Sequence, residues 1–368
     1  MKIPLGHPDI GKDEIQAVTE TMKSGWVTQG RKVEQFEDAF ANYCGAKHGI
    51  AANSGTAALH LALAALDIKP GDEIITTPLS CVATTNPILY QGARPIFVDV
   101  EPETLNINPE LIERRITPKT KAILPVHLFG HPVDLDPLLE IAQNHNIPVI
   151  EDAAQAHGAR YKGTRVGSFG HTSCFSFYAD KLITTVEGGM ALTNDPETAY
   201  KMRLLRSLGM TKENKFYHPV LGYNYKMPDI SAAIGLIQLR KLDSYIEKKR
   251  GNIAYLKDQI NHSNLKLPGE LDYAFNVYYV SHVLAEREKD KEKIVAYLTR
   301  KEIETRPLLS FIPEQPPYKK YGYNLKELRT AKNAHEKGFY FSNSPSLTQE
   351  QLSYLASALK KSVEETQQ

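Results

Sequence analysis

The fold is decided by residues 173–190, which read SCFSFYADKLITTVEGGM. The run Cys174–Tyr178 is almost entirely apolar or aromatic, which is typical of a strand that is covered on both faces of a sheet. A single lysine, Lys181, follows this run and precedes two glycines, Gly188 and Gly189. Most lysines in such a position lie in solvated loops, and the alternative is an ammonium group at the mouth of a buried sheet. The rest of the chain decides between these two interpretations.

Residues 48–195 alternate short apolar runs with helical patterns such as Thr56–Leu66 and Asp134–Asn146. The runs predicted as strands are Gly49–Asn53, Glu73–Pro78, Pro95–Val100, Ala122–Leu128, Pro148–Ala154, Cys174–Tyr178 and Gly189–Asn194. This alternation predicts a mainly parallel, seven-stranded α/β sheet that is flanked by helices. Ligands of such sheets bind at the carboxyl ends of the strands. We therefore expect the ends of the first, fifth and sixth strands to surround one cleft.

The pattern changes after residue 227. A long helical pattern covers Pro228–Ile260, Ala274–Ala285 is predicted as a strand, and a closing helix covers Leu347–Val363. A chain of 368 residues exceeds the roughly 250–300 residues at which a single core stops growing. We therefore predict a large α/β domain at residues 1–245 and a smaller α+β domain at residues 246–368.

Composition excludes several classes of function. The formal net charge is only +1, and the charged runs mix both signs, so no nucleic-acid partner is expected. No stretch of about 18 apolar residues is present, so no membrane association is expected. Three cysteines, Cys44, Cys81 and Cys174, are widely spaced and form no CxxC pair, which argues against disulfides and against a metal site. These features favour a cytoplasmic protein.

Two further motifs lie at predicted strand ends. The sequence NSGTAAL at Asn53–Leu59 leads through Gly55 into a helix, whose exposed N–H groups are suited to a phosphate, although many α/β loops share this feature. Asp152 follows an apolar strand, where it is either a turn residue or a carboxylate on the floor of the cleft.

Three groups are needed to hold pyridoxal 5'-phosphate (PLP): a loop that binds its phosphate, a carboxylate beside its ring nitrogen, and a desolvated lysine that attacks its carbonyl group. Gly55, Asp152 and Lys181 offer them on successive strand ends. A nicotinamide dehydrogenase is the alternative for such a sheet, but NSGTAAL lacks the GxGxxG spacing.

The chain resembles the DegT/DnrJ/EryC1/StrS family of PLP-dependent nucleotide-sugar aminotransferases, which have the aspartate-aminotransferase (type I) fold. The resemblance extends over nearly the whole chain. It rests on the segments GWVTQGRKVEQFEDAFANYCGAKHGIAANSGTAALHLAL, KPGDEII, VHLFGHPVDLD, IEDAAQAHGARYKG, FSFYADKLITTVEGGM and GYNYKMPDISAAIGLIQL.

The resemblance implies a role for each matching residue. Lys181 is the lysine that carries the cofactor through a Schiff base, and Asp152 pairs with the pyridinium nitrogen. The remaining implied contacts are Gln155 at the ring hydroxyl, Gly55, Thr56 and Ser176 at the phosphate, and Asn224 at the phosphate of the neighbouring subunit's cofactor. The family forms homodimers with shared active sites, so a homodimer is expected.

Two residues depart from the family pattern and one marks a branch. Cys81 stands where an aromatic side chain commonly stacks on the cofactor ring, and it offers less surface. Lys226 stands where an arginine is usual, so it keeps the charge but loses the bidentate fork. Some relatives that dehydrate sugars replace the cofactor lysine by histidine, whereas Lys181 is retained and favours transamination.

The family's usual amino donor is L-glutamate, and its acceptor is a nucleotide-linked keto sugar. The stretch at residues 206–227 resembles members that aminate C4 of a 4-keto-6-deoxy sugar in the biosynthesis of O-antigen or related glycans. Amination at C3 is the alternative, followed by a non-catalytic sensor with the same fold. The sequence leaves the nucleotide open between GDP, dTDP and UDP.

Three residues are candidates for contacts with the substrate, namely His157, Lys226 and Arg306. His157 has packing in the core as its structural alternative, and Arg306 has a surface ion pair.

Overall fold

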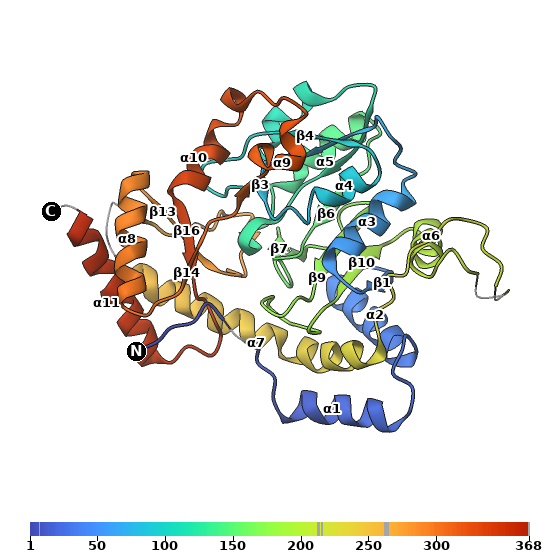
Figure 1. Cartoon of the computed structure of the whole chain (residues 1–368), viewed down its shortest axis with the longest axis horizontal. Coiled ribbons are helices and arrows are strands. Elements are labelled where there is room, and N and C mark those ends of the chain that lie inside the picture. Colours follow the sequence, from blue (N-terminus) through green and yellow to red (C-terminus); the bar gives the residue numbers. More distant parts are fainter. Residues whose placement is uncertain (7, 212–213, 215, 261–264, 367–368) are drawn as a thin grey trace.

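The computed structural model describes residues 1–6, 8–211, 214, 216–260 and 265–366. Within these residues, seven strands form the central sheet. Figure 1 shows its position in the molecule. In order across the sheet the strands are β1 (His48–Ala52), β10 (Gly189–Thr193), β9 (Thr172–Ser176), β6 (Ile150–Asp152), β5 (Thr120–Leu124), β2 (Glu73–Thr76) and β4 (Arg94–Phe97). Parallel bridges from Ile123 to Val149 and from Val126 to Asp152 join β5 to β6. Only β10 is antiparallel to its neighbours, so the predicted mainly parallel sheet is confirmed.

The two faces of the sheet are covered by different helices, because side chains alternate along each strand. Cys174 of β9 packs against α3 (Gly55–Ala65), whereas its neighbour Phe175 packs against α2 (Arg31–Cys44) and α7 (Asp229–Gln259). All five residues of β9 are buried, which explains why the strand reads as an apolar run.

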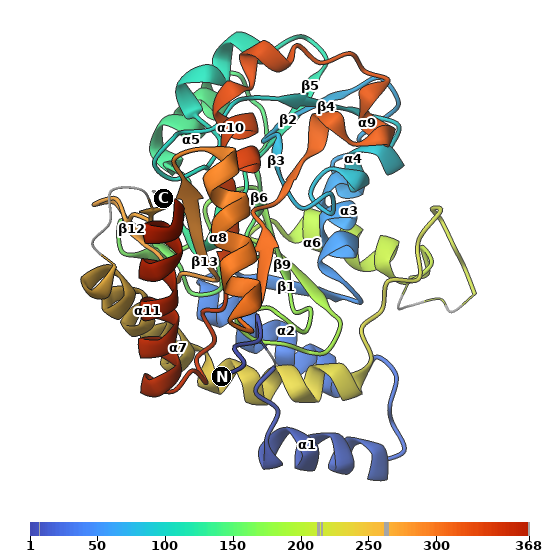
Figure 2. The ribbon, with the colours of Figure 1, turned by 60° about the vertical axis from the view of Figure 1, so that its left-hand side comes forward.

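The remaining elements of the large part flank this sheet. They are α1 (Lys12–Lys23), β3 (Leu79–Ser80), α4 (Asn86–Tyr90), α5 (Leu135–Asn144), β7 (Arg160–Tyr161), β8 (Thr164–Arg165) and α6 (Pro196–Arg206). Helix α1 lies along α7, and the described residues that follow α6 project away from the body (Figures 1 and 2).

The C-terminal part contains a second sheet, which is entirely antiparallel and has the strand order β11-β13-β16-β14. Helices α8 and α11 pack together beside it (Figure 2). The elements after α7 are β11 (Leu265–Lys266), β12 (Ala274–Phe275), β13 (Ser281–Ala285), α8 (Glu288–Arg300), β14 (Thr305–Pro307), β15 (Ser310–Phe311), α9 (Pro316–Lys319), α10 (Arg329–Lys337), β16 (Gly338–Phe341) and α11 (Gln349–Thr366). The predicted α+β character of this part is therefore confirmed.

The prediction of one strand over Ala274–Ala285 was wrong. The structure has two strands, β12 and β13, separated by residues 276–280. Tyr278 has φ 47°, outside the strand region, and Tyr279 donates its N–H to the Phe129 carbonyl of the large part. This segment therefore connects β12, which pairs with β7 of the large part, to β13 of the small sheet, and it contacts the large part on the way.

The predicted division at residue 245 falls inside α7, which continues unbroken from Asp229 to Gln259. Tyr245 belongs to the core beneath the central sheet, whereas Leu256 belongs to the core between α8 and α11. The division between residues 1–245 and 246–368 therefore remains a prediction. Within the described ranges, no helix is both long enough and apolar enough to cross a membrane.

Candidate active site

A cavity of about 210 Å³ lies at the carboxyl ends of the central strands. It is lined by residues from the loops after β1, β3, β6 and β9, as the parallel topology predicts. Seven residues singled out in the sequence meet there, namely Gly55, Thr56, Cys81, Asp152, Gln155, Ser176 and Lys181. Their roles toward the cofactor remain predictions, but the sequence placed them at one site.

The start of α3 and the end of β9 form one wall of the cavity. Ser54 caps the helix by accepting the Ala57 N–H at 3.1 Å. A Cβ atom on Gly55 would lie 2.7 Å from Cβ of Ser176, so only glycine permits this approach. Because the first turn of a helix presents unpaired N–H groups, this wall fits a phosphate flanked by Gly55, Thr56 and Ser176.

Asp152 is the carboxylate on the floor of the cavity, and it is 4% exposed. Thr84 donates its hydroxyl to Oδ2 at 2.8 Å, and the Ala154 N–H reaches Oδ1 at 3.1 Å. Burial raises the pKa of Asp152 above its usual value, against the lowering effect of these two hydrogen bonds. A pyridinium nitrogen beside it would favour the ionised form, so the site fits a cationic ring.

The neighbouring carboxylate, Glu151, serves the scaffold instead. It accepts hydrogen bonds from His127 Nε2 at 3.0 Å, Ser173 Oγ at 2.5 Å and Gly170 N at 2.7 Å. Burial would raise the pKa of Glu151, but these donors hold it below its usual value. Strand alternation thus directs only Asp152 into the cavity.

Lys181 is not an ordinary loop lysine, since its side chain is only 15% exposed. Its Nζ lies 3.0 Å from the Tyr279 hydroxyl and 3.4 Å from Oδ1 of Asp180. The same Nζ lies 4.5 Å from the centre of the Tyr279 ring. Burial and the charge of Asp180 raise the pKa of Tyr279, so its hydroxyl stays protonated.

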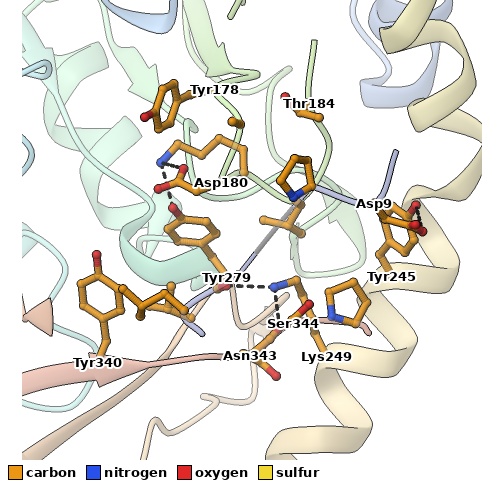
Figure 3. Close-up of a pocket in the computed structure, with 18 of the residues that line it drawn as sticks. Asp9, Tyr178, Asp180, Thr184, Tyr245, Lys249, Tyr279, Tyr340, Asn343 and Ser344 are labelled. Atoms are coloured by element: carbon orange, nitrogen blue, oxygen red, sulfur yellow. Dashed lines mark hydrogen bonds and ion pairs between the residues drawn. The ribbon is translucent and has the colours of Figure 1, made fainter. Parts of the chain in front are cut away.

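A larger cavity of about 400 Å³ adjoins the first one, and Tyr178 and Lys181 line both. Figure 3 shows residues that line the larger cavity, among them Tyr178, Tyr279 and Tyr340. Arg306 of β14 lines the larger cavity together with Tyr340. Among the ion pairs and hydrogen bonds of the described residues, none involves the Arg306 side chain, so the surface ion pair considered for it is not found. This cavity offers room for a substrate directly beside the lysine.

Three predicted residues, Asn224, Lys226 and His157, line neither cavity. Asn224 is exposed and pairs with Ser207, and Lys226 is half-buried on the same segment. Of the stretch 206–227 that carries them, residues 212, 213 and 215 lie outside the described part of the chain.

His157 needs a correction, because the structure contradicts its predicted contact with the substrate. The side chain is fully buried, and its ring packs between Phe40, Phe175 and Phe177 at centroid distances of 6.1, 5.3 and 5.4 Å. Burial lowers the pKa of His157 to about 3, so the ring is neutral. The packing interpretation is the correct one.

Sequence reasoning missed Thr84 and Tyr279, which hold Asp152 and Lys181 in place. Thr84 lies 68 residues from Asp152 in the chain, and Tyr279 lies 98 residues from Lys181. No motif joins either pair, so the fold alone brings them together.

The site combines a buried carboxylate, a helix start that requires glycine and a shielded lysine, all at the carboxyl ends of a mainly parallel sheet. This combination defines a PLP-dependent enzyme of the aspartate-aminotransferase fold. The comparison with known families makes this more specific. The chain belongs to the DegT/DnrJ/EryC1/StrS aminotransferase family, whose pattern matches residues 8–360. The predicted family, fold, cofactor and enzyme class are therefore confirmed.

Similar proteins cover almost the whole chain. The GDP-perosamine synthase of Caulobacter vibrioides is 42% identical over 326 residues, which are 86% of this chain and 87% of that protein. The GDP-perosamine synthase of Escherichia coli O157:H7 is 38% identical over 358 residues, or 97% of each chain. Spr1654 from Streptococcus pneumoniae, assigned as a sugar aminotransferase and solved in a PMP (pyridoxamine phosphate) form, has a TM-score of 0.96 and 27% identity over 100% of this chain and 99% of its own. Its PLP form has a TM-score of 0.95, with 99% of each chain covered.

Proposed function

We propose that this enzyme transfers the amino group of L-glutamate to C4 of a GDP-linked 4-keto-6-deoxy sugar, in the biosynthesis of O-antigen or a related glycan. The chemistry rests on one observation, the shielded Lys181 amine at the junction of two cavities beside Asp152. The choice of GDP and of C4 is supported by the two relatives named GDP-perosamine synthase.

The protein's own groups divide the work around the cofactor. Bound PLP supplies an aldehyde for attachment and a ring that takes up the electron pair left when the donor's α C–H bond breaks. With PLP bound, Asp152 would keep the ring nitrogen protonated, and the Lys181 amine would hold the cofactor through its aldehyde carbon. With its amine free, Lys181 would be placed to move the proton between the donor's α-carbon and the cofactor.

The remaining groups bind and orient. Gly55, Thr56 and Ser176 hold the phosphate at the start of α3. Gln155 Oε1 accepts the Phe129 N–H at 2.7 Å, which leaves the Gln155 amide N–H groups for the ring hydroxyl. Arg306 lines the adjoining cavity, where it is available to bind a substrate carboxylate.

We further propose a cytoplasmic homodimer in which Asn224 reaches the phosphate of the neighbouring subunit's cofactor and Lys226 contacts the substrate. An apolar partner surface is supported by the segment after α6, where Phe216 and Leu221 are each 90% exposed. Free cysteines fit a reducing compartment. Residues 1–245 and 246–368 are the proposed domains, joined by α7.

The test is the absorbance spectrum of the purified protein with PLP, for wild type and Lys181→Ala, before and after L-glutamate. Wild type is expected to show the visible band of a lysine-bound cofactor, which glutamate bleaches, whereas Lys181→Ala lacks that band. The glutamate-treated enzyme is then mixed with GDP-, dTDP- and UDP-linked 4-keto-6-deoxy sugars, and the product is located by NMR. An amine at C3, or a band that ignores glutamate, would overturn the proposal.

A further inference from the structure

A lysine without a carboxylate partner is buried in α7, near the catalytic lysine. Lys249 is 6% exposed, and none of the ion pairs of the described residues includes it. Its ammonium group donates instead to the carbonyl of Tyr279 at 3.0 Å and to the carbonyl of Asn343 at 2.6 Å (Figure 3). Burial lowers the pKa of Lys249 to about 7, against the favourable charge of Asp180, so a lysine here is costly and its retention calls for a reason.

These hydrogen bonds tie three separate segments together. Asn343 follows β16, and its Nδ2 donates to the Tyr278 carbonyl at 2.7 Å. Asn252, one turn after Lys249 in α7, donates to Oδ1 of Asn343 at 3.2 Å. Helix α7 is therefore hydrogen-bonded to the turn after β16 and to the segment that contains Tyr278 and Tyr279.

The backbone of Tyr279 is held from two sides as a result. Its N–H donates to the Phe129 carbonyl at 2.9 Å, and its own carbonyl accepts from Lys249. With the main chain fixed, the side chain extends in the opposite direction to its carbonyl, and its hydroxyl lies 3.0 Å from Nζ of Lys181 (Figure 3).

We propose that Lys249 is a positioning residue for transamination, which fixes the Tyr279 main chain so that the Tyr279 hydroxyl holds the Lys181 amine. This inference rests on the proposed role of Lys181 as the proton carrier. A proton carrier must stay within hydrogen-bonding reach of the reacting carbon, and small misplacements lower the rate strongly. Lys249 also lines the larger cavity, but its amine is held by the two carbonyl groups, and in this proposal it acts on the reaction through Tyr279.

The first measurement uses cofactor-free protein and needs no activity. An amine-reactive reagent labels Lys181, and peptide mass spectrometry follows the rate. Tyr279→Phe removes the hydrogen bond directly, and Lys249→Met removes both of its carbonyl contacts. Each is expected to change labelling by about 2- to 10-fold, the range for one lost hydrogen bond, and the double variant is expected to change it no further.

The second measurement is the single-turnover rate with L-glutamate at saturating PLP. Lys249→Met is expected to lower this rate by about 10- to 100-fold, with little change in PLP affinity. Lys241→Met is the matched control, because Lys241 lies two turns earlier in α7 and binds Glu14 at 2.6 Å, away from Tyr279. It is expected to leave both labelling and turnover unchanged.

Two outcomes would overturn the inference. If Lys249→Met lowers the melting temperature but leaves Lys181 labelling and turnover as in wild type, Lys249 is only structural. If the effects of Lys249→Met and Tyr279→Phe add in the double variant, Lys249 does not act through Tyr279. Should Lys249→Met fail to fold, Lys249→Gln is measured instead, because glutamine is long enough to reach at most one of the two carbonyl groups. Labelling of Lys181 at the wild-type rate in Lys249→Gln would again mean that Lys249 is only structural. A protein that binds no PLP refutes the proposed function while leaving the labelling test interpretable.

Discussion

Substituting Gly55 by alanine tests whether α3 and β9 form the phosphate site. The added Cβ would lie 2.7 Å from Cβ and 3.2 Å from Cα of Ser176, whereas ordinary contacts begin at 3.4 Å. Because the Cα atom is also crowded, rotating the Ser176 side chain does not relieve the contact. The start of the helix must move by about 0.7 Å, at a cost of about 1–3 kcal/mol.

A shift of this size removes one or two charge-assisted hydrogen bonds to the phosphate. At about 1.5–3 kcal/mol for each bond, PLP is expected to bind at least 10- to 100-fold more weakly. Equilibrium titration of cofactor-free protein with PLP measures the affinity, and differential scanning calorimetry measures the stability.

Gly251→Ala is the matched control, since a Cβ there meets no atom within 4 Å and the residue lies in the middle of α7. Alanine is expected to stabilise this helix by about 0.5–1 kcal/mol and to leave PLP affinity unchanged. Wild-type PLP affinity in Gly55→Ala would refute the assignment of the phosphate to this wall.

Three further predictions concern the floor, the lysine and the core. Thr84→Val removes a hydrogen-bond donor that favours the ionised carboxylate, so the pKa of Asp152 is expected to rise further. The acid limb of the pH–rate profile is then expected to move to higher pH, and PLP to bind about 2- to 10-fold more weakly. An unchanged pH–rate profile contradicts this prediction. Lys181→Ala is expected to fold with a wild-type melting temperature, because among the described residues its amine contacts only Tyr279 and Asp180, yet to lose glutamate-dependent bleaching completely. His157, with a folded pKa of about 3 against about 6.5 unfolded, takes up a proton only on unfolding, so its contribution to stability is present above pH 6.5 and falls as the pH drops toward 3. His157→Phe is expected to retain activity and to reduce the loss of stability between pH 7 and pH 5, by about 2 kcal/mol, as measured by urea denaturation at both pH values.

The seven central strands could be predicted because strands that are covered on both faces are mostly apolar. The meeting of Gly55, Asp152 and Lys181 could also be predicted, since parallel topology brings strand ends to one edge. The single strand over Ala274–Ala285 failed for a local reason. The left-handed turn at Tyr278 is stabilised by contacts with Asn276 and Asn343, which sequence periodicity does not encode.

The contrast between His157 and Arg306 shows where sequence reasoning about a site ends. Both are polar residues near recognised motifs, yet His157 lies beneath the floor among phenylalanines and Arg306 lines the cavity beside Lys181. Five residues separate Asp152 from His157, enough for the chain to leave the strand end and turn under α2, so proximity in sequence does not give exposure. The same argument explains Tyr279, which reaches Lys181 because the segment between β12 and β13 is held against the large part. Groups on strand ends follow from topology, whereas the groups that orient them come from long-range packing, and Lys249 belongs to this second kind.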